Sequence, residues 1–188
     1  MSPKLTKHFS GLVSGTIIGT LLVVVMFESM LATSLPLEKH QQQKVERAIA
    51  LLEKTGFGRD AFLLRHAAFY RSSDNWLNYF APKENAFAST NMPFSIITLY
   101  PDFYSRAKDD TERAVILLHE SRHLRGESEA SAYAYVWRNR EKLNWTQMRY
   151  GVSEMYISVE LQTRQFAPDV FSCSDRLWKD CTAQLRTR

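Results

Sequence analysis

The sequence contains little cysteine: only two of its 188 residues. A zinc site with four cysteine ligands and a disulfide-rich scaffold are therefore both excluded. Cys173 and Cys181 lie eight positions apart near the C-terminus. In an oxidising compartment this separation can close a small loop, so we expect a disulfide with a structural rather than a catalytic role.

An excess of one charge is also lacking. Lysine and arginine number 24 against 20 aspartate and glutamate residues, and the positive residues are scattered along the chain. A dedicated nucleic-acid-binding protein is therefore not expected. The 45% of hydrophobic and 23% of charged residues exclude a disordered chain and a coiled coil. They fit one compact domain with an appendage.

Charged residues are absent from Phe9 to Phe27, and the second half of this run is densely apolar. Nineteen helical residues reach about 28 Å, close to the hydrocarbon thickness of a bilayer. We therefore predict a transmembrane helix over 9–27, after an N-terminal segment over 1–8 and before a juxtamembrane linker over 28–37. The folded domain would then occupy 38–188.

The charges that flank this run predict its orientation. Lys4 and Lys7 precede it, and Glu28 is the first charge after it. By the positive-inside tendency the N-terminus lies in the cytoplasm and the domain outside. The alternative to an uncleaved anchor is a secretory signal, with Ala32-Thr33-Ser34 as the nearest cleavage site.

Three glycines in the apolar run suggest how two anchors could meet. Gly11, Gly15 and Gly19 recur at four-residue spacing on one helix face, a pattern that lets membrane helices approach closely. A homodimer through this face is one hypothesis. The other is that glycine is simply common in membrane helices.

The remaining sequence predicts an α+β fold that is mainly helical. Apolar residues at helical spacing, with glycine and polar residues at the ends, predict helices over 38–55, 60–70, 109–123, 128–143 and 152–164. The β-branched and aromatic run 94–100, which follows the turn signal Asn91-Met92-Pro93, predicts a strand with 86–90 as its hairpin partner. The helix over 109–123 is apolar on nearly all sides, so we expect it to be buried.

The buried helix ends in His119-Glu120-Ser121-Arg122-His123. Histidines at positions i and i+4 lie one turn apart on one helix face, so both imidazoles can reach a single ion. A carboxylate at the second position can take a proton from an activated water and pass it to a leaving amine. This spacing is typical of zinc hydrolases. Two helix-terminal histidines beside an ordinary surface glutamate are the alternative.

A catalytic zinc ion needs a third protein ligand. Gly126 can adopt a left-handed conformation and turn the chain back after the helix. Glu127 and Glu129 follow, and we predict Glu129 as the ligand because it can face both histidines from the start of the next helix. Glu127 is the fallback. The alternative for either carboxylate is stabilisation of a helix N-terminus.

With these residues the chain resembles the zincin metallopeptidases, the group defined by His-Glu-x-x-His on a helix. The resemblance covers residues 119–129 and, more loosely, the strand 94–100, which corresponds to the edge strand that lines the substrate cleft in zincins. The spacing of His119, His123, Gly126 and Glu129 is similar to that of metzincins, although those carry His or Asp where this chain has Glu129. Gluzincins use Glu as third ligand after a longer connection. The subgroup therefore stays open.

The resemblance implies bound Zn²⁺, with His119, His123 and Glu129 as ligands and Glu120 as general base and then acid. Met155 is only faintly like the methionine turn of metzincins, and core packing is our interpretation of it. Zincins often stabilise the oxyanion with a tyrosine or histidine, and Tyr133, Tyr135 and Tyr156 are candidates without an assigned role. His66 is interpreted as a structural histidine.

The function expected from the sequence is a membrane-anchored zinc metallohydrolase that acts on a peptide or protein substrate. A membrane-tethered binding or structural module that keeps a zincin-like fold without turnover is the alternative.

Overall fold

The computed structural model describes residues 3–80 and 87–171 and divides into two compact units. The first unit is Met1–Leu35 with Asp74–Ala81, and the second is Pro36–Ser73 with Pro82–Arg188, as far as these ranges are described. Cys173 and Cys181 lie outside the described residues, so the expected disulfide stays a prediction.

The first unit is built on one long helix, α1 (Pro3–Ala32), with the short 3-10 turn η1 (Asn78–Phe80). The helix is longer than the predicted span 9–27, and residues 28–32 of the predicted linker are helical. Its segment Val13–Ala32 has a mean hydropathy of 1.9 and is long and apolar enough to cross a membrane. Within this unit the Trp76 indole donates a hydrogen bond to the Ser29 hydroxyl at 3.0 Å.

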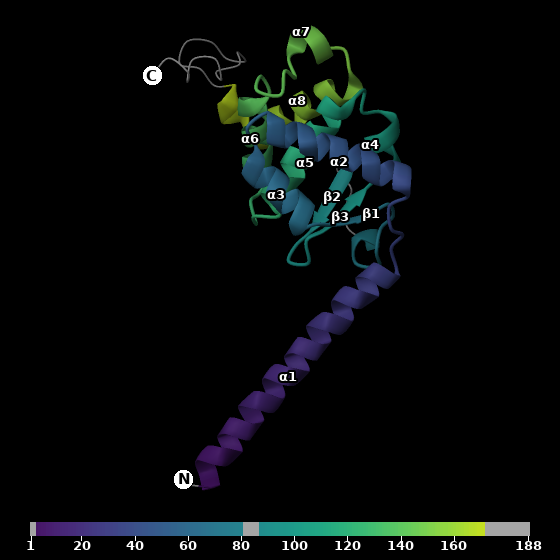
Figure 1. Ribbon diagram of the computed structural model, residues 1–188. Coiled ribbons are helices and arrows are strands. Elements are labelled where there is room, and N and C mark those ends of the chain that lie inside the picture. The colour runs from purple at the N-terminus through teal and green to yellow at the C-terminus, as the bar shows by residue number, and fades with distance from the viewer. Residues whose placement is uncertain (1–2, 81–86, 172–188) are drawn as a thin grey trace. The chain divides into compact units, whose positions relative to one another are not determined.

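The second unit is mainly helical, as the sequence predicted (Figure 1). Its helices are α2 (Lys39–Lys54), α3 (Gly58–His66), α4 (Pro101–Ser105), α5 (Asp110–His123), α6 (Glu129–Asn139), α7 (Gln147–Tyr150) and α8 (Glu154–Phe166), followed by the 3-10 turn η2 (Pro168–Val170). The five helices predicted here are present, although α6 ends four residues early. The short helices α4 and α7 were not predicted.

A small sheet completes this unit. Strands β1 (Phe69–Arg71), β2 (Ala88–Asn91) and β3 (Ile96–Leu99) lie in the order β1-β3-β2. The predicted hairpin is confirmed, since β2 pairs antiparallel with β3. All four residues of β3 are buried, which explains its apolar sequence. Among the described strands β2 is an edge.

Strand β1 corrects the predicted helix over 60–70. Helix α3 ends at His66, and Phe69 to Arg71 pair in parallel with Ile96 to Thr98. Pairing with β3 overrides the local helical pattern of these residues. The local sequence does not indicate this pairing, because the partner strand lies 27 positions away. Aromatic and long side chains fit the half-buried sheet surface.

Helix α5 is the central helix of this unit and packs against α2, α3, α6 and β2 (Figure 1). Residues 112–118 are all buried, as predicted. Asp109 caps its N-terminus by accepting hydrogen bonds from the backbone N–H groups of Thr111 and Glu112. The Tyr150 hydroxyl donates to the same carboxylate at 2.7 Å. The helix that carries the histidine motif is therefore fixed at both its apolar surface and its start.

Candidate metal centre

The chain reverses direction directly after the histidine motif. Gly126 has φ +74°, its N–H donates to the carbonyl of His123 at 2.8 Å, and the N–H of Glu127 donates to the carbonyl of Arg122 at 3.1 Å. This pair of hydrogen bonds is a Schellman motif, which favours glycine at the left-handed position. The predicted turn at Gly126 is confirmed. It brings α6, whose first residue is Glu129, back beside the end of α5.

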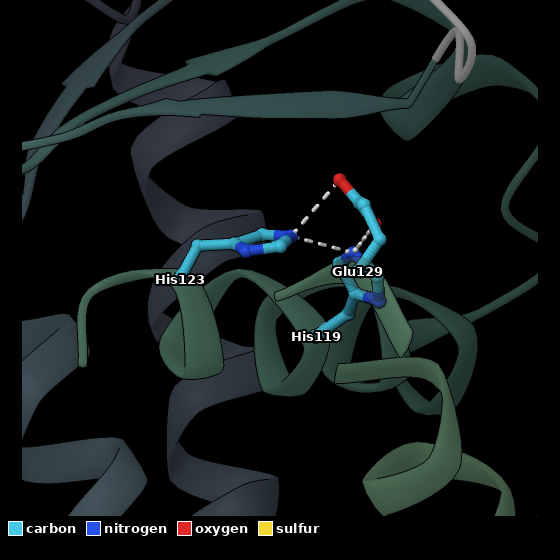
Figure 2. Close-up of side chains that lie close together, drawn as sticks. All are labelled: His119, His123 and Glu129. Atoms are coloured by element: carbon cyan, nitrogen blue, oxygen red, sulfur yellow. Dashed lines mark hydrogen bonds and ion pairs between the residues drawn. The ribbon is translucent and has the colours of Figure 1, made fainter. Parts of the chain in front are cut away.

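Three predicted ligands converge at this turn. His119 and His123 lie on α5 and point toward Glu129 at the start of α6 (Figure 2). The two Nε2 atoms are 3.0 Å apart. Oε2 of Glu129 lies 3.1 Å from Nε2 of His119, and Oε1 lies 3.3 Å from Nε2 of His123. The histidine side chains are 12% and 16% exposed, and that of Glu129 is 48% exposed.

These distances fit a metal ion. Ligand atoms at about 2.0 to 2.1 Å from a tetrahedral zinc ion are about 3.3 Å from one another. The Nε2–Nε2 separation of 3.0 Å and the 3.1 Å between Nε2 of His119 and Oε2 of Glu129 are close to two edges of such a tetrahedron, and the other carboxylate oxygen lies 3.3 Å from Nε2 of His123. Two imidazoles and one carboxylate are also a ligand set of catalytic zinc, which keeps its fourth position for water or substrate. The half-exposed Glu129 leaves one side of the group open.

The other nitrogen of His123 has a partner of its own. Its Nδ1–H donates to the backbone carbonyl of Glu127 at 2.9 Å. Metal-binding histidines typically make such a bond, which fixes the tautomer and directs Nε2 toward the ion. Glu127 therefore supports the centre through its main chain.

The side chain of Glu127 is engaged elsewhere. Its carboxylate accepts hydrogen bonds from the guanidinium of Arg122 and from the Ser131 hydroxyl. Burial alone would raise the pKa of this carboxyl, but those two partners lower it. Geometry thus favours Glu129 over the fallback Glu127 as third ligand.

Packing rather than a hydrogen bond supports the Nδ1 side of the His119 ring. Its Nδ1 is buried and has no hydrogen-bond partner among the described residues. The ring lies against that of buried Tyr133, with centroids 4.4 Å apart, and Tyr133 in turn stacks on Phe166. Of the three candidate tyrosines, Tyr133 is the one whose ring packs against a predicted ligand.

The other two tyrosines lie elsewhere. The Tyr135 hydroxyl donates to Asp60, and its ring lies beneath the guanidinium of Arg122. Tyr156 is buried against Trp137 and Trp145. Met155 is fully buried, in agreement with its interpretation as a core residue.

Glu120 is buried, with 5% of its surface exposed. Its Oε2 accepts a hydrogen bond from the Thr90 hydroxyl at 2.6 Å, so β2 holds the carboxylate in place. Sequence reasoning missed Thr90, which lies 30 positions from Glu120. Position 90 was within the predicted hairpin, but nothing in the sequence indicated which helix the hairpin would meet.

A small apolar pocket adjoins both His119 and Glu120. It measures about 30 Å³, and its walls include Ala88, Val115, Ile116, Val136 and Val159. The walls come from β2, α5, α6 and α8, so the pocket lies between these elements, beside the candidate metal-binding group. Its size suits a small aliphatic group.

Mutual interactions set the charges of the ligands in the metal-free protein. Burial alone would lower the pKa of His123, but a hydrogen bond to Glu129 and the charge of Glu120 raise it to about 9. Hydrogen bonds from His119 and His123 hold the pKa of Glu129 far below its ordinary value. The group is thus an ion pair until a metal ion displaces the proton on His123.

His66 lies outside the group. It is exposed near the end of α3, with its ring 4.7 Å from that of Phe62. It is therefore a surface residue of a helix.

Comparison with protein-family models, with curated proteins and with solved structures gives no match to this chain.

Proposed function

We propose that the protein is a membrane-anchored zinc metallohydrolase that resembles the zincins and cleaves peptide bonds. The observation that carries this proposal is the convergence of His119, His123 and Glu129, whose ligand atoms all lie within 4.8 Å of one another. A buried carboxylate, Glu120, follows the first of these ligands directly in the sequence.

The chemistry of the donors supports zinc. His119, His123 and Glu129 would hold the ion, and a zinc ion in such a site supplies Lewis-acid activation of water at neutral pH. Glu120 would accept the proton of the attacking water and then deliver it to the nitrogen of the leaving amine. The Thr90 hydroxyl keeps one carboxylate oxygen in place and leaves the other for this transfer.

The position of β2 supports a peptide as the substrate. An extended peptide can add to the edge of a sheet through main-chain hydrogen bonds. Because Thr90 of β2 touches Glu120, a peptide along this edge would pass close to the general base. The pocket beside His119 and Glu120 would then receive a small aliphatic side chain of that peptide.

Anchoring is proposed through α1. Its span Val13–Ala32 satisfies the length and hydropathy of a membrane helix, and Lys4 and Lys7 favour a cytoplasmic N-terminus. A homodimer through Gly11, Gly15 and Gly19 stays a hypothesis. Protease protection of a C-terminal tag in sealed vesicles tests the orientation, since a tag that is cut only from the cytoplasmic side contradicts it.

Metal analysis and peptide hydrolysis test the proposed function on the full chain in detergent. We expect one equivalent of zinc, lost in His119→Ala and His123→Ala but retained in the surface control His66→Ala. Glu120→Gln should keep the metal and abolish hydrolysis. Hydrolysis at the wild-type rate in Glu120→Gln would overturn the assignment of the base. A folded wild-type protein that binds no zinc would favour the non-catalytic module.

A further inference from the structure

A second cluster of charged residues lies where α3 meets α5. Asp60 of α3 is only 3% exposed. Its Oδ1 accepts hydrogen bonds from the Ser121 hydroxyl at 2.9 Å, from Arg122 at 3.4 Å and from Arg125 at 3.2 Å. One buried carboxylate therefore holds two guanidinium groups.

These guanidinium groups border an open hollow of about 480 Å³. Its lining consists of Gly56, Phe57, Gly58, Arg59, Asp60, Arg122, Arg125 and Tyr135. A second hollow of about 400 Å³ shares Gly58, Arg59 and Arg125 with the first, and its other walls are the apolar side chains of Phe62 and Leu63. Charged and apolar surfaces are thus adjacent.

Positive charge exceeds negative charge in this place. Arg59, Arg122 and Arg125 face the hollow, and the carboxylates that oppose them are Asp60 and Glu127. Arg59 is exposed and pairs with no residue in the described part of the chain. One guanidinium is therefore left without a counter-ion.

Many donors of the paired arginines also stay available. Each guanidinium carries five N–H groups. Arg122 donates three hydrogen bonds, to Glu127 and Asp60, and Arg125 donates one, to Asp60. The bonds that are made fix the orientation of both side chains, which reduces the entropy lost when a ligand binds.

We propose that this arginine pocket (Gly58, Arg59, Arg122 and Arg125) binds a phosphate group carried by an apolar chain. Three guanidinium groups from separate positions suit a tetrahedral anion with several oxygens better than a carboxylate with two. The apolar chain would lie against Phe62 and Leu63 in the adjoining hollow. A phospholipid headgroup and a soluble phosphate ester share this chemistry.

The arginine pocket does not include the proposed metal ligands. Neither hollow is lined by His119, His123 or Glu129. Ser121, which faces Asp60, lies two residues after His119, and side chains two positions apart point to different sides of a helix. Phosphate binding is therefore expected whether or not the chain is a hydrolase.

Calorimetric titration of the full chain in a phosphate-free maltoside detergent tests the proposal, with inorganic phosphate and butyl phosphate as probes at constant ionic strength. Both should bind, and butyl phosphate should bind about tenfold more tightly because part of its chain is buried. His119→Ala should bind both probes as the wild type does. Binding lost in that variant would place the anion at the metal and overturn the proposal.

Gly58 offers a test that leaves the ion pairs intact. A Cβ atom at this position meets no atom within 4 Å. Gly58→Glu should lower the affinity for both probes by at least about tenfold relative to Gly58→Gln, which fills the same space without a charge. Arg59→Gln should lower the affinity for both probes. Phe62→Ser should leave the affinity for inorganic phosphate unchanged and remove only the tighter binding of butyl phosphate. Unchanged affinities in Gly58→Glu and Arg59→Gln would show that the arginines only tie the helices together.

The source of the phosphate is decided by replacing the detergent with lipid. If butyl phosphate binds more weakly in phospholipid nanodiscs than in the detergent, lipid headgroups compete for the arginine pocket and are its ligand. Equal affinity in detergent and in nanodiscs assigns the pocket to a soluble phosphate ester. No measurable binding of butyl phosphate in the detergent overturns the proposal.

Discussion

The Nδ1–H of His123 donates a 2.9 Å hydrogen bond to the backbone carbonyl of Glu127. The carbonyl belongs to the turn between α5 and α6, and the carboxylate of the same residue is held by Arg122 and Ser131. The Arg122–Glu127 ion pair therefore fixes the main-chain group that orients a proposed metal ligand.

Glu127→Gln should weaken zinc binding without removing a ligand. Loss of the charge loosens the turn and with it the partner of His123, and changes in such supporting groups typically cost about tenfold to 100-fold in metal affinity. Competition with a chromophoric chelator measures the affinity. Glu154→Gln, a change in an exposed acidic residue on α8, is the control. A zinc affinity equal to that of the wild type would assign the ion pair a purely structural role.

Zinc binding should depend on pH through His123. Its pKa in the metal-free protein is raised to about 9, so below that value a proton must leave before the metal binds. The apparent affinity should fall about tenfold for each pH unit below 9 through this group. Titrations at several pH values measure the slope. A flat profile from pH 9 to pH 7 would contradict the assignment of His123 as a ligand.

The raised pKa of His123 also predicts how the stability of the metal-free protein depends on pH. A histidine whose folded pKa is raised contributes stability that is fully present below its ordinary pKa of 6.5 and is lost as the pH rises through about 9. Urea unfolding of the chelator-treated protein at pH 6.5 and above pH 9 measures the loss. His123→Ala should remove most of this dependence, and an unaltered dependence in that variant would attribute it to other groups.

Thr90→Val should lower turnover and leave zinc content unchanged. The substitution keeps the shape of the side chain but removes the donor that positions Glu120. A lost hydrogen bond to a charged group corresponds to about a tenfold effect or more on kcat. Thr90→Ser retains the hydroxyl and should stay near the wild type. Equal kcat values for the valine and serine variants would remove Thr90 from the site.

The apolar pocket should set side-chain preference. With about 30 Å³ available beside His119, the wild type should favour peptides with a small aliphatic residue there. Val159→Ala enlarges the pocket and should improve kcat/KM for a larger aliphatic residue by about tenfold. Val152→Ala, a change at a valine that is 93% exposed, is the matched control. The same preference in all three proteins would place the substrate elsewhere.

Local patterns in the sequence predicted the parts of the site that are close in the chain. The spacing of His119 and His123 placed both on one face of α5, and Gly126 indicated the turn that returns Glu129 to them. Contacts across the fold were not predictable in this way. Which helix Thr90 would touch depends on how the hairpin packs on α5.

The helices and strands were likewise predictable only where their local sequence pattern is strong. Apolar residues at helical spacing predicted the bounds of α2, α5 and α8 within a few residues, because these residues form the buried faces of the helices. Strand β1 was missed, since three residues carry little pattern and their structure is set by parallel pairing with β3. The role of Glu127 was missed for another reason: a backbone carbonyl has no signature in the sequence.

The turn at Gly126 also has a consequence for the order of folding. It places all three proposed ligands within eleven consecutive residues, from His119 to Glu129. Closing so short a segment costs little chain entropy, whereas pairing Phe69 with Ile96 closes a much longer loop. The candidate metal centre is thus a local structure that the chain can close before the sheet forms, and a bound ion would then act as a nucleus for the remaining fold.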